Sequence, residues 1–216
     1  MSDKRALLLD LDGTLADSLG AMRDVYTQFL AGFGCEGTNA EFTALNGPPL
    51  PEVVRLLMER HRLPGSHGDL LEQYLALLDE VYSQVPAAPG AANLVRDACS
   101  AGWATVVVTS APSALAHNWL RATGIEDSID AVVGGEMVAR GKPHPDPYIA
   151  GLAAVGADAA RSLAVEDSQQ GVTAALAAGV PTLYYRPDAR ARTESEEPIG
   201  VIAVVGHLDD VAGRLR

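Results

Sequence analysis

Short apolar runs alternate with longer amphipathic stretches along most of the chain. The runs are rich in Val, Leu and Ala, are bounded by glycine or polar residues, and are too short for helices. Such runs are typical of strands buried on both faces of a sheet. We therefore predict strands over residues 6–9, 104–108, 131–133, 162–165, 181–185 and 201–205.

The stretches between these strands repeat apolar residues at helical spacing. Several of them stop at a glycine, which is a common residue just beyond a helix C-terminus. Helices are predicted over residues 91–101, 113–123, 145–155, 170–178 and 207–215, and the polar segment 187–198 is predicted to be an exposed loop. Strands that alternate with helices through short links indicate an α/β fold with a doubly wound, parallel, Rossmann-like sheet.

Residues 18–86 interrupt this alternation directly after the first strand. The runs 50–58 and 70–78 have helical spacing, and breakers such as Asn46-Gly47-Pro48-Pro49 separate the helical pieces. Pro86 to Gly90 forms a stiff connection back to the alternating pattern. We predict an α/β core made of residues 1–15 and 87–216, with a separate helical cap, residues 16–86 (the cap segment), over the carboxyl edge of the sheet.

Composition and charge narrow the possible partners. The AVILMFWYC residues make up 48% of the chain and the charged residues 20%, as in ordinary globular proteins. A net charge of −12 argues against nucleic acid and anionic membrane surfaces as partners. Cys35 and Cys99 have no metal-site spacing and are expected to be buried free thiols. With the first predicted strand so near Met1 there is no room for a signal peptide, so we expect a cytoplasmic enzyme.

Two aspartates stand where the first predicted strand ends. Asp10 and Asp12 are two residues apart, so their side chains start from the same side of the chain, and Gly13 supplies freedom to turn there. Ligands of open α/β sheets bind beyond the carboxyl ends of the strands. Two carboxylates so close are costly without a cation or a proton between them. A pair of solvated turn aspartates is the alternative interpretation.

Other polar residues follow the later predicted strands. Thr109-Ser110 and Glu166-Asp167 each end a strand, and Lys142 lies in a loop; Lys4 is the one other lysine among 16 basic residues. Carboxylates are ligands for Mg²⁺, while hydroxyl and ammonium groups donate to phosphate oxygens. The set predicts a magnesium and phosphoryl site. The alternative is that Thr109-Ser110, and Asp167 or Ser168, cap the helices that follow them.

These motifs together resemble the haloacid dehalogenase-like hydrolase superfamily, in its branch with a helical cap inserted after the first strand. Their order and separation agree with that family over essentially the whole length. The resemblance implies a Mg²⁺-dependent phosphatase or phosphotransferase. The matching segments are Asp10-Leu11-Asp12-Gly13-Thr14-Leu15-Ala16-Asp17-Ser18, Val107-Val108-Thr109-Ser110, Gly141-Lys142-Pro143-His144-Pro145-Asp146-Pro147-Tyr148 and Val165-Glu166-Asp167-Ser168.

The resemblance also implies catalytic roles. Asp10 would be the nucleophile that becomes an aspartyl phosphate. Asp12 would be the general acid and then the base, which requires surroundings that raise its pKa. Lys142, with Gly13, Thr109 and Ser110, would hold the transferring phosphoryl group.

The implied metal site is made of acidic residues. Mg²⁺ would be bound by the Asp10 carboxylate, the Asp12 backbone carbonyl and the Asp167 carboxylate, with Glu166 acting through water. Each of these ligands is an oxygen, as Mg²⁺ prefers.

Within the superfamily, the favoured interpretation is a phosphoglycolate phosphatase-like enzyme that acts on a small phosphorylated metabolite. A β-phosphoglucomutase-like mutase is the alternative, weakened because Met22 replaces the histidine of that group. Phosphonate hydrolases need a cap lysine, and residues 16–86 contain none. A phospho-accepting signalling module or a non-catalytic binding protein is a hypothesis of another class. Arg23 and Arg55 are candidates to meet a substrate carboxylate, and a monomer and a homodimer both remain open.

Overall fold

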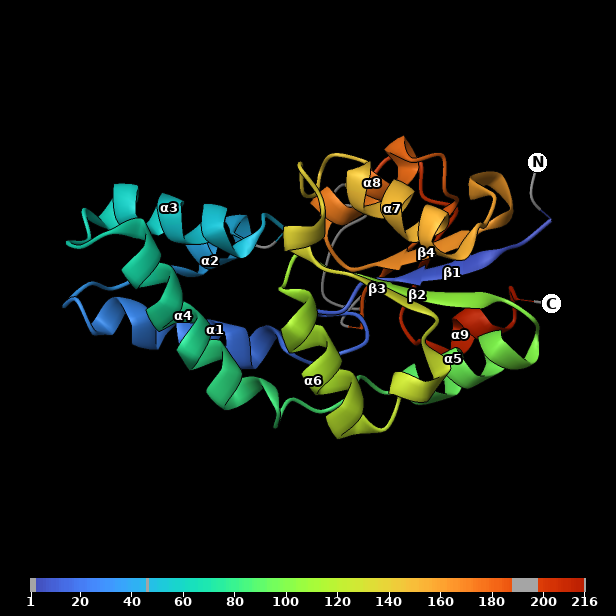
Figure 1. Cartoon of the computed structure of the whole chain (residues 1–216), viewed down its shortest axis with the longest axis horizontal. Helices are drawn as coiled ribbons and strands as arrows, with labels where there is room; N and C mark the ends of the chain where they lie inside the picture. The colour runs from blue at the N-terminus through green and yellow to red at the C-terminus, as the bar shows by residue number, and fades with distance from the viewer. Residues whose placement is uncertain (1–2, 46, 188–197, 216) are drawn as a thin grey trace.

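A computed structural model describes residues 3–45, 47–187 and 198–215 of the chain. Its centre is a six-stranded sheet in which every neighbouring pair is parallel, with the order β3-β2-β1-β4-β5-β6 (Figure 1). This confirms the predicted α/β class. The strands are β1 Ala6–Leu9, β2 Ala104–Val108, β3 Ala131–Val133, β4 Leu163–Glu166, β5 Thr182–Tyr185 and β6 Ala203–Val205.

The first strand occupies the middle of the sheet. In register, Leu7 of β1 pairs with Thr105 of β2 on one side and Leu163 of β4 on the other. In the same register Asp10, the residue after β1, lies level with Val108 and Glu166, the last residues of β2 and β4. Because all three strands are parallel, their polar carboxyl ends meet at one edge, as the sequence predicts.

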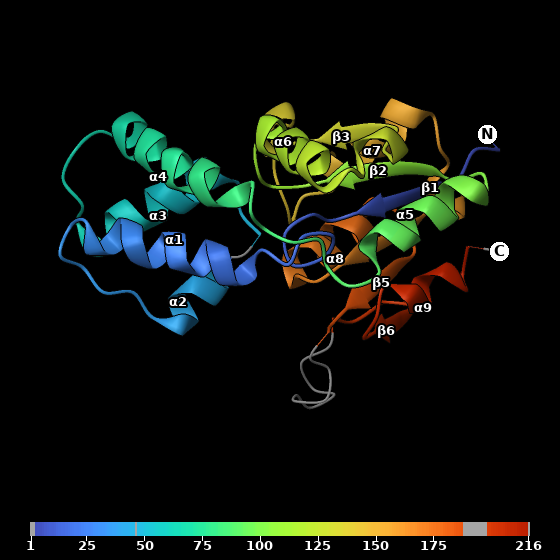
Figure 2. The same cartoon turned by 90° about the horizontal axis from the view of Figure 1, so that it is seen from below.

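Helices cover both faces of the sheet (Figure 2). Alternate residues of the central strand face opposite layers. Leu7 and Leu9 belong to the core cluster with α5, α6 and α9, and Ala6 and Leu8 to the cluster with α7 and α8. These helices are α5 Ala91–Ser100, α6 Ser113–Thr123, α7 Asp146–Val155, α8 Gln169–Ala177 and α9 Asp209–Ala212, with single 3₁₀ turns at Glu126–Ser128, Gly135–Met137 and Ala159–Arg161.

Four helices, α1 Leu19–Ala31, α2 Asn39–Ala44, α3 Leu50–His61 and α4 His67–Tyr82, lie together beside the sheet (Figure 1). Aromatic side chains join them: Phe29 of α1 packs edge-on against Tyr74 of α4, with ring centroids 5.0 Å apart. The described part of the cap segment is thus helical, as expected. Its boundaries at residues 16 and 86 stay a prediction.

The two chain crossings between core and cap segment lie side by side and are hydrogen-bonded. The Asp17 amide donates to the Pro86 carbonyl at 3.0 Å, and the Ala88 amide donates to the Leu15 carbonyl at 2.8 Å. Trp119 of α6 adds a bond from its indole nitrogen to the Val85 carbonyl at 2.9 Å. These bonds fix where α1 and α4 leave the sheet edge.

The C-terminal region differs from the expectation. The helix predicted over 207–215 is a single turn, Asp209–Ala212, and the strand predicted over 201–205 begins at Ala203. Beyond α9 the Leu215 carbonyl accepts a hydrogen bond from the Trp103 indole at 2.8 Å. This tertiary contact replaces a further helical turn. Most of the predicted loop 187–198, and Asn46 of the predicted breaker, lie outside the described residues.

Two simpler expectations concern cysteines and membrane spans. Cys35 and Cys99 are both free thiols, as predicted, but the expected burial is wrong, because Cys35 is half-buried and Cys99 is exposed. Within the described ranges, no helix combines the length and the apolar character needed to cross a bilayer.

Candidate active site

Local structure at the end of β1 places Asp10 and opens room for Asp167. The Asp10 amide continues the sheet by donating to the Val165 carbonyl at 3.1 Å. Gly13 has a φ of +85°, and a Cβ at this position would overlap the Asp167 carboxylate. Glycine is therefore required twice over, for its backbone conformation and for this close approach.

Lys142 is the cationic centre of the edge. Its ammonium donates to Asp10 Oδ1 at 2.5 Å and to the Val108 carbonyl at 3.1 Å, and it also bonds to Glu166 Oε1. Lys142 is buried. Burial opposes its charge, but the neighbouring Asp10 and Glu166 carboxylates outweigh this and raise the pKa of Lys142 above its ordinary value.

Glu166 is completely buried and held by several donors. Tyr148 of α7 donates to its Oε1 at 2.7 Å, and the Ser168 hydroxyl lies 3.1 Å from its Oε2. A Cβ on Gly171 would overlap this carboxylate, so the first turn of α8 comes close to Glu166 only because it carries a glycine. The buried Glu166 carboxylate thus orients the Lys142 ammonium.

Three carboxylates converge beside this lysine. Asp10, Glu166 and Asp167 each offer an oxygen, and these oxygens all lie within 4.8 Å of one another. Burial, followed by the charge of Glu166, raises the pKa of Asp10 to about 8. Burial and then the charge of Asp10 also raise the pKa of Asp167. One ammonium among three acids leaves an excess of negative charge, which a divalent cation with oxygen ligands fits.

Asp12 has separate surroundings. Its carboxylate is not among the three converging acids; instead Ser18 donates to its Oδ1 at 2.8 Å and Tyr82 donates to the same oxygen at 2.6 Å. Burial raises its pKa, and the bonds from Tyr82 and Ser18 offset this only in part. The direction is the one expected of a general acid.

Thr109 and Ser110 follow β2 on the other side of Asp10. The Thr109 amide donates to the Val133 carbonyl at 2.9 Å, and its hydroxyl accepts from the Ala111 amide at 3.0 Å. The Ser110 hydroxyl donates to the Gly47 carbonyl at 2.6 Å, which joins core and cap segment.

The helix-capping alternatives are now decided. Neither Thr109 nor Ser110 caps α6, whose first amide, that of Ser113, donates to the Glu136 carboxylate at 3.0 Å. Ser168, by contrast, is the N-cap of α8 and accepts from the Gly171 amide at 3.0 Å. Asp167 is thereby left to the acidic cluster.

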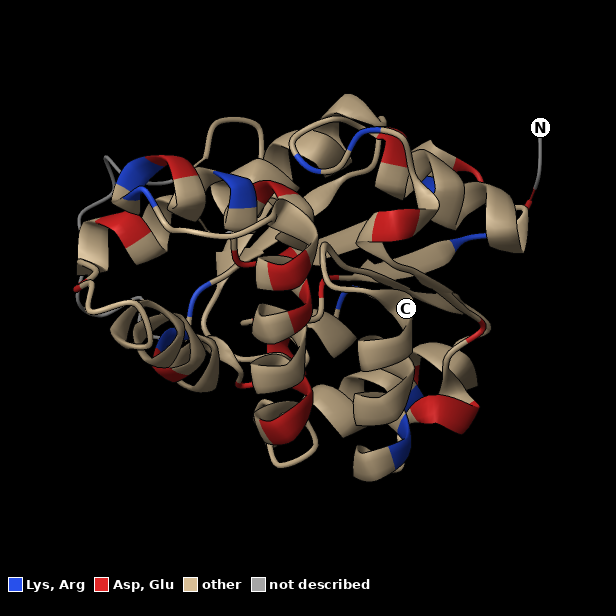
Figure 3. Cartoon of the chain, turned by 60° about the vertical axis from the view of Figure 1, so that its left-hand side comes forward, with Lys and Arg blue, Asp and Glu red and all other residues tan. Residues whose placement is uncertain are grey.

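A cavity of about 80 Å³ lies between the sheet edge and the cap segment. Gly13 and Glu166 are not part of its lining; Glu166 lies behind it. The predicted site residues that do line it are Asp10, Asp12, Thr109, Ser110, Lys142 and Asp167. Acidic positions recur along the helices (Figure 3), in keeping with 28 acidic against 16 basic residues in the chain. Among the described residues that line the cavity, Lys142 supplies the positive charge.

Two site residues were not singled out from the sequence. Tyr148 stands inside the Gly141–Tyr148 motif, but its bond to Glu166 could not be inferred from spacing. Tyr82 continues the spacing of Leu70, Tyr74 and Leu78 along α4, which is the signal of an ordinary core position. Burial and the charge of Asp12 raise the pKa of Tyr82, so its hydroxyl remains a donor.

Comparison with known proteins agrees with this fold. The chain is 28% identical over 186 residues to a bifunctional riboflavin kinase/FMN phosphatase of Arabidopsis thaliana, covering 82% of this chain and 47% of that protein, about half its length. It is 32% identical over 195 residues to a plasmid phosphoglycolate phosphatase of Cupriavidus necator, covering 84% of this chain and 80% of that one.

Among solved structures, CbbY from Rhodobacter sphaeroides in complex with phosphate superposes with a TM-score of 0.84 at 24% identity, covering 96% of both chains. That likeness supports the fold. The model of the haloacid dehalogenase-like hydrolase family matches residues 7–185. The buried acids around Lys142 thus stand in a chain that belongs to the haloacid dehalogenase-like hydrolase family.

Proposed function

We propose that this protein is a Mg²⁺-dependent phosphatase that hydrolyses a small phosphomonoester through an aspartyl phosphate on Asp10. The observation that carries the proposal is the placement of Asp10. Its carboxylate contacts Lys142, converges with Asp167 and lines the same cavity as Asp12. A nucleophile, a cation and a separate acid therefore share one site.

Residues at the carboxyl edge of the sheet would bind the phosphoryl group and Mg²⁺. Lys142, Thr109 and Ser110 would donate to the phosphoryl oxygens from positions that line the cavity. Asp10 and Asp167 would hold Mg²⁺ with the Asp12 backbone carbonyl, and Glu166 would act through water. When bound, the ion would neutralise part of the charge on the phosphoryl oxygens.

In the first step, an oxygen of Asp10 attacks phosphorus and the bond from phosphorus to the alcohol oxygen breaks. Asp12 gives its proton to that departing oxygen, which its raised pKa favours. In the second step, Asp12 takes a proton from water, the water oxygen bonds to phosphorus, and the bond from Asp10 to phosphorus breaks. Inorganic phosphate leaves and both aspartates return to their starting states.

The names of the relatives support a phosphatase and make phosphoglycolate the first substrate to test. The sugar phosphomutase alternative requires transfer to a second sugar hydroxyl. Met22, at the position where that group carries histidine, is part of an apolar lining here. The same substrate panel, read for sugar phosphate isomers, separates the two reactions.

The test is phosphate release from an aryl phosphate and from a panel of phosphorylated metabolites, with Mg²⁺ and with a chelator. We expect turnover that disappears on chelation and returns with Mg²⁺. Asp10→Asn, which keeps the side-chain shape, should lower kcat about 10³-fold or more. Asp79→Asn, at an exposed position of α4, is the matched control and should leave kcat unchanged. Folded protein that releases no phosphate from any ester would refute the proposal.

A further inference from the structure

The cavity has two chemically different walls. Its sheet side carries Lys142 and the aspartates described above, where the phosphoryl group would lie. Its other wall comes from the cap segment and is built from Leu19, Met22, Phe42, Leu50, Tyr74 and Leu78, among other apolar residues. The group attached to the phosphate would therefore meet the apolar wall.

No positive charge stands on that wall. Among the described lining residues, Lys142 is the one cationic side chain, and it is already bonded to Asp10 and Glu166. The arginines of the cap segment do not line the cavity; they are Arg23, Arg55, Arg60 and Arg62.

The two arginines considered from the sequence are engaged elsewhere. Arg55 is exposed and forms ion pairs with Glu52 and Glu59 on its own helix, each at 2.5 Å. Arg23 is exposed and bonds to Asn39. Arg60 forms an ion pair with Glu41 and does not line the cavity. None of these three arginines is therefore placed to bind a substrate carboxylate in the cavity.

The cap-segment wall of the cavity offers few hydrogen-bonding groups to a ligand, and those described below are uncharged. The Tyr26 hydroxyl is engaged, since it donates to Glu41 at 2.5 Å and accepts from the Thr38 amide at 3.1 Å. Tyr74 is buried, and within the described residues its hydroxyl forms no hydrogen bond. Its raised pKa, caused by burial, keeps it protonated. It offers one uncharged partner to a ligand.

An anionic substituent would be disfavoured here for two reasons. It would lose its hydration without a compensating cation, and it would approach the carboxylates of Asp10, Asp12 and Asp167. An apolar substituent, in contrast, gains free energy with every methylene removed from water, equivalent to about threefold or more in affinity.

We propose that the alcohol released by this enzyme is neutral and predominantly apolar, such as an aliphatic or aromatic alcohol with no more than a neutral polar end. The assignment rests on the phosphatase function proposed above. It makes phosphoglycolate, or an ester with a second phosphate, a poor substrate.

The test compares two esters of the same shape and different charge on the Mg²⁺-loaded full chain. Isobutyl phosphate has the heavy-atom outline of phosphoglycolate without its carboxylate. We expect its kcat/KM to exceed that of phosphoglycolate by about tenfold or more. Along the series from ethyl to hexyl phosphate, kcat/KM should rise about threefold per methylene until the wall is covered.

Variants of the wall sharpen the comparison. Met22 is half-buried on α1. Met22→Arg should lower the ratio of kcat/KM for isobutyl phosphate to kcat/KM for phosphoglycolate at least tenfold. Met22→Leu should keep this ratio above one. Leu45→Arg, also at a half-buried lining position, serves if Met22→Arg does not fold. Arg23→Ala and Arg55→Ala are the surface controls and should leave the ratio unchanged.

The outcomes distinguish this inference from the function on which it rests. Phosphatase activity with phosphoglycolate equal to or better than isobutyl phosphate would overturn the apolar leaving group and leave the phosphatase in place. A selective fall in kcat/KM for phosphoglycolate in Arg23→Ala or Arg55→Ala, which raises the ratio of isobutyl phosphate to phosphoglycolate, would also overturn it. Absence of phosphate release from every ester would overturn both proposals.

Discussion

At the scale of single residues, the two aspartates of the site differ in the donors that bond to their carboxylate oxygens. Ser18 and Tyr82 both donate to Oδ1 of Asp12, and a side-chain bond from Thr109 also lowers the pKa of this carboxyl. Asp10 instead contacts Lys142, whose charge opposes the rise that burial and Glu166 cause in the pKa of Asp10. Two aspartates two residues apart acquire different roles from these partners.

Tyr82→Phe tests this division because it deletes one donor to Asp12 and keeps the ring. We expect kcat to fall about tenfold, since an acid that has lost one of its donors is less well aimed, with KM changed by less than about twofold. The free energy of unfolding should fall by about 1 kcal/mol. Steady-state kinetics with the aryl phosphate and urea unfolding measure both quantities.

Ser18→Ala removes the other donor and should change kcat in the same direction. A variant pair in which kcat is unaffected and stability alone falls would show that these bonds are structural. Rescue of a lowered kcat by Ser18→Thr, which restores a hydroxyl, would favour the positioning role.

At the scale of elements, two helices begin with the same serine cap in different surroundings. Ser168 caps α8 through the Gly171 amide at 3.0 Å, and Ser66 caps α4 through the Asp69 amide at 3.2 Å. Ser168 also contacts Glu166, the carboxylate that orients Lys142. The cap of α8 therefore connects helix stability to the site, whereas the cap of α4 does not.

Ser168→Ala and Ser66→Ala should each lower the free energy of unfolding by about 1 kcal/mol, the usual contribution of an N-cap. Ser168→Ala should in addition lower kcat several-fold, because Glu166 loses a partner. Urea unfolding and kinetics of the two variants make the comparison. Equal kcat values in the two variants would contradict the link between this cap and Lys142.

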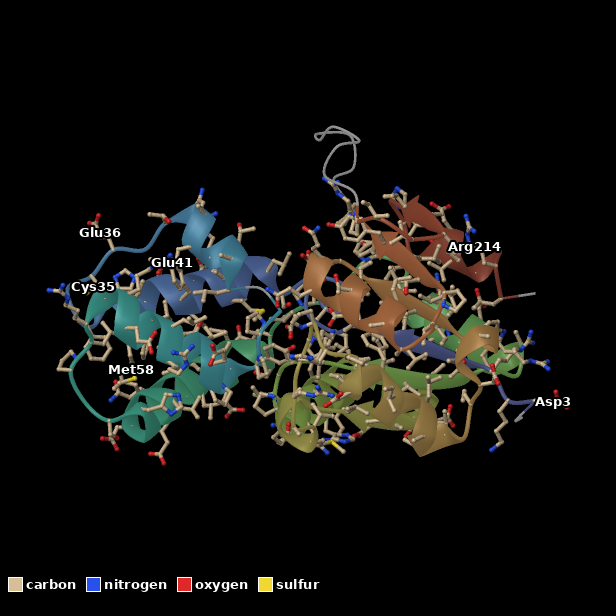
Figure 4. All side chains as sticks on the ribbon, turned by 90° about the horizontal axis from the view of Figure 1, so that it is seen from above. Asp3, Cys35, Glu36, Glu41, Met58 and Arg214 are labelled. Carbon is tan, nitrogen blue, oxygen red and sulfur yellow. The ribbon has the colours of Figure 1, made fainter. Side chains whose placement is uncertain are left out.

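Glu41 connects three helices of the cap segment. It lies among those helices, whereas Glu36 projects from the surface (Figure 4). Tyr26 donates to it from α1, and Arg60 and His61 contact it from α3 at 3.1 and 3.0 Å. Burial opposes the charge of this carboxylate, but these bonds outweigh burial and lower the pKa of Glu41 below its ordinary 4.5.

A lowered pKa gives the folded protein stability that is present above pH 4.5 and is lost as the pH falls through the folded-state pKa of Glu41. Glu41→Gln should therefore cost roughly 1–2 kcal/mol at pH 7 and progressively less under acid conditions. Urea unfolding across this pH range measures the difference. Glu36→Gln is the exposed control; a pH-independent cost for Glu41→Gln would contradict the account.

At the scale of the whole molecule, local pattern predicted the elements better than their arrangement. Short apolar runs and glycine stops located the six strands of the described sheet, because burial on both faces requires continuous apolar residues. The strand order could not be derived, since any strand can pair with several others through a right-handed crossover. The last helix was overestimated because the bond from Trp103 to Leu215 is tertiary.

Some features of the site were likewise predicted from the local sequence pattern, and others were not. Residues that end strands were predicted, because parallel strands bring their carboxyl ends to one edge. Tyr82 was missed because its spacing on α4 equals that of core residues. The cap segment was predicted as helical, yet the apolar character of its cavity wall depends on how its helices pack and became visible only in three dimensions. The oligomeric state stays a prediction.

The central claim is that Asp10 carries the phosphoryl group between substrate and water. Rapid acid quench of the Mg²⁺-loaded protein mixed with radiolabelled aryl phosphate, followed by borohydride reduction and peptide mass spectrometry, tests it directly. We expect label on the protein during turnover, reduction to homoserine at position 10, and neither in Asp10→Asn. Turnover without labelled protein, or label at a residue other than Asp10, would contradict the account.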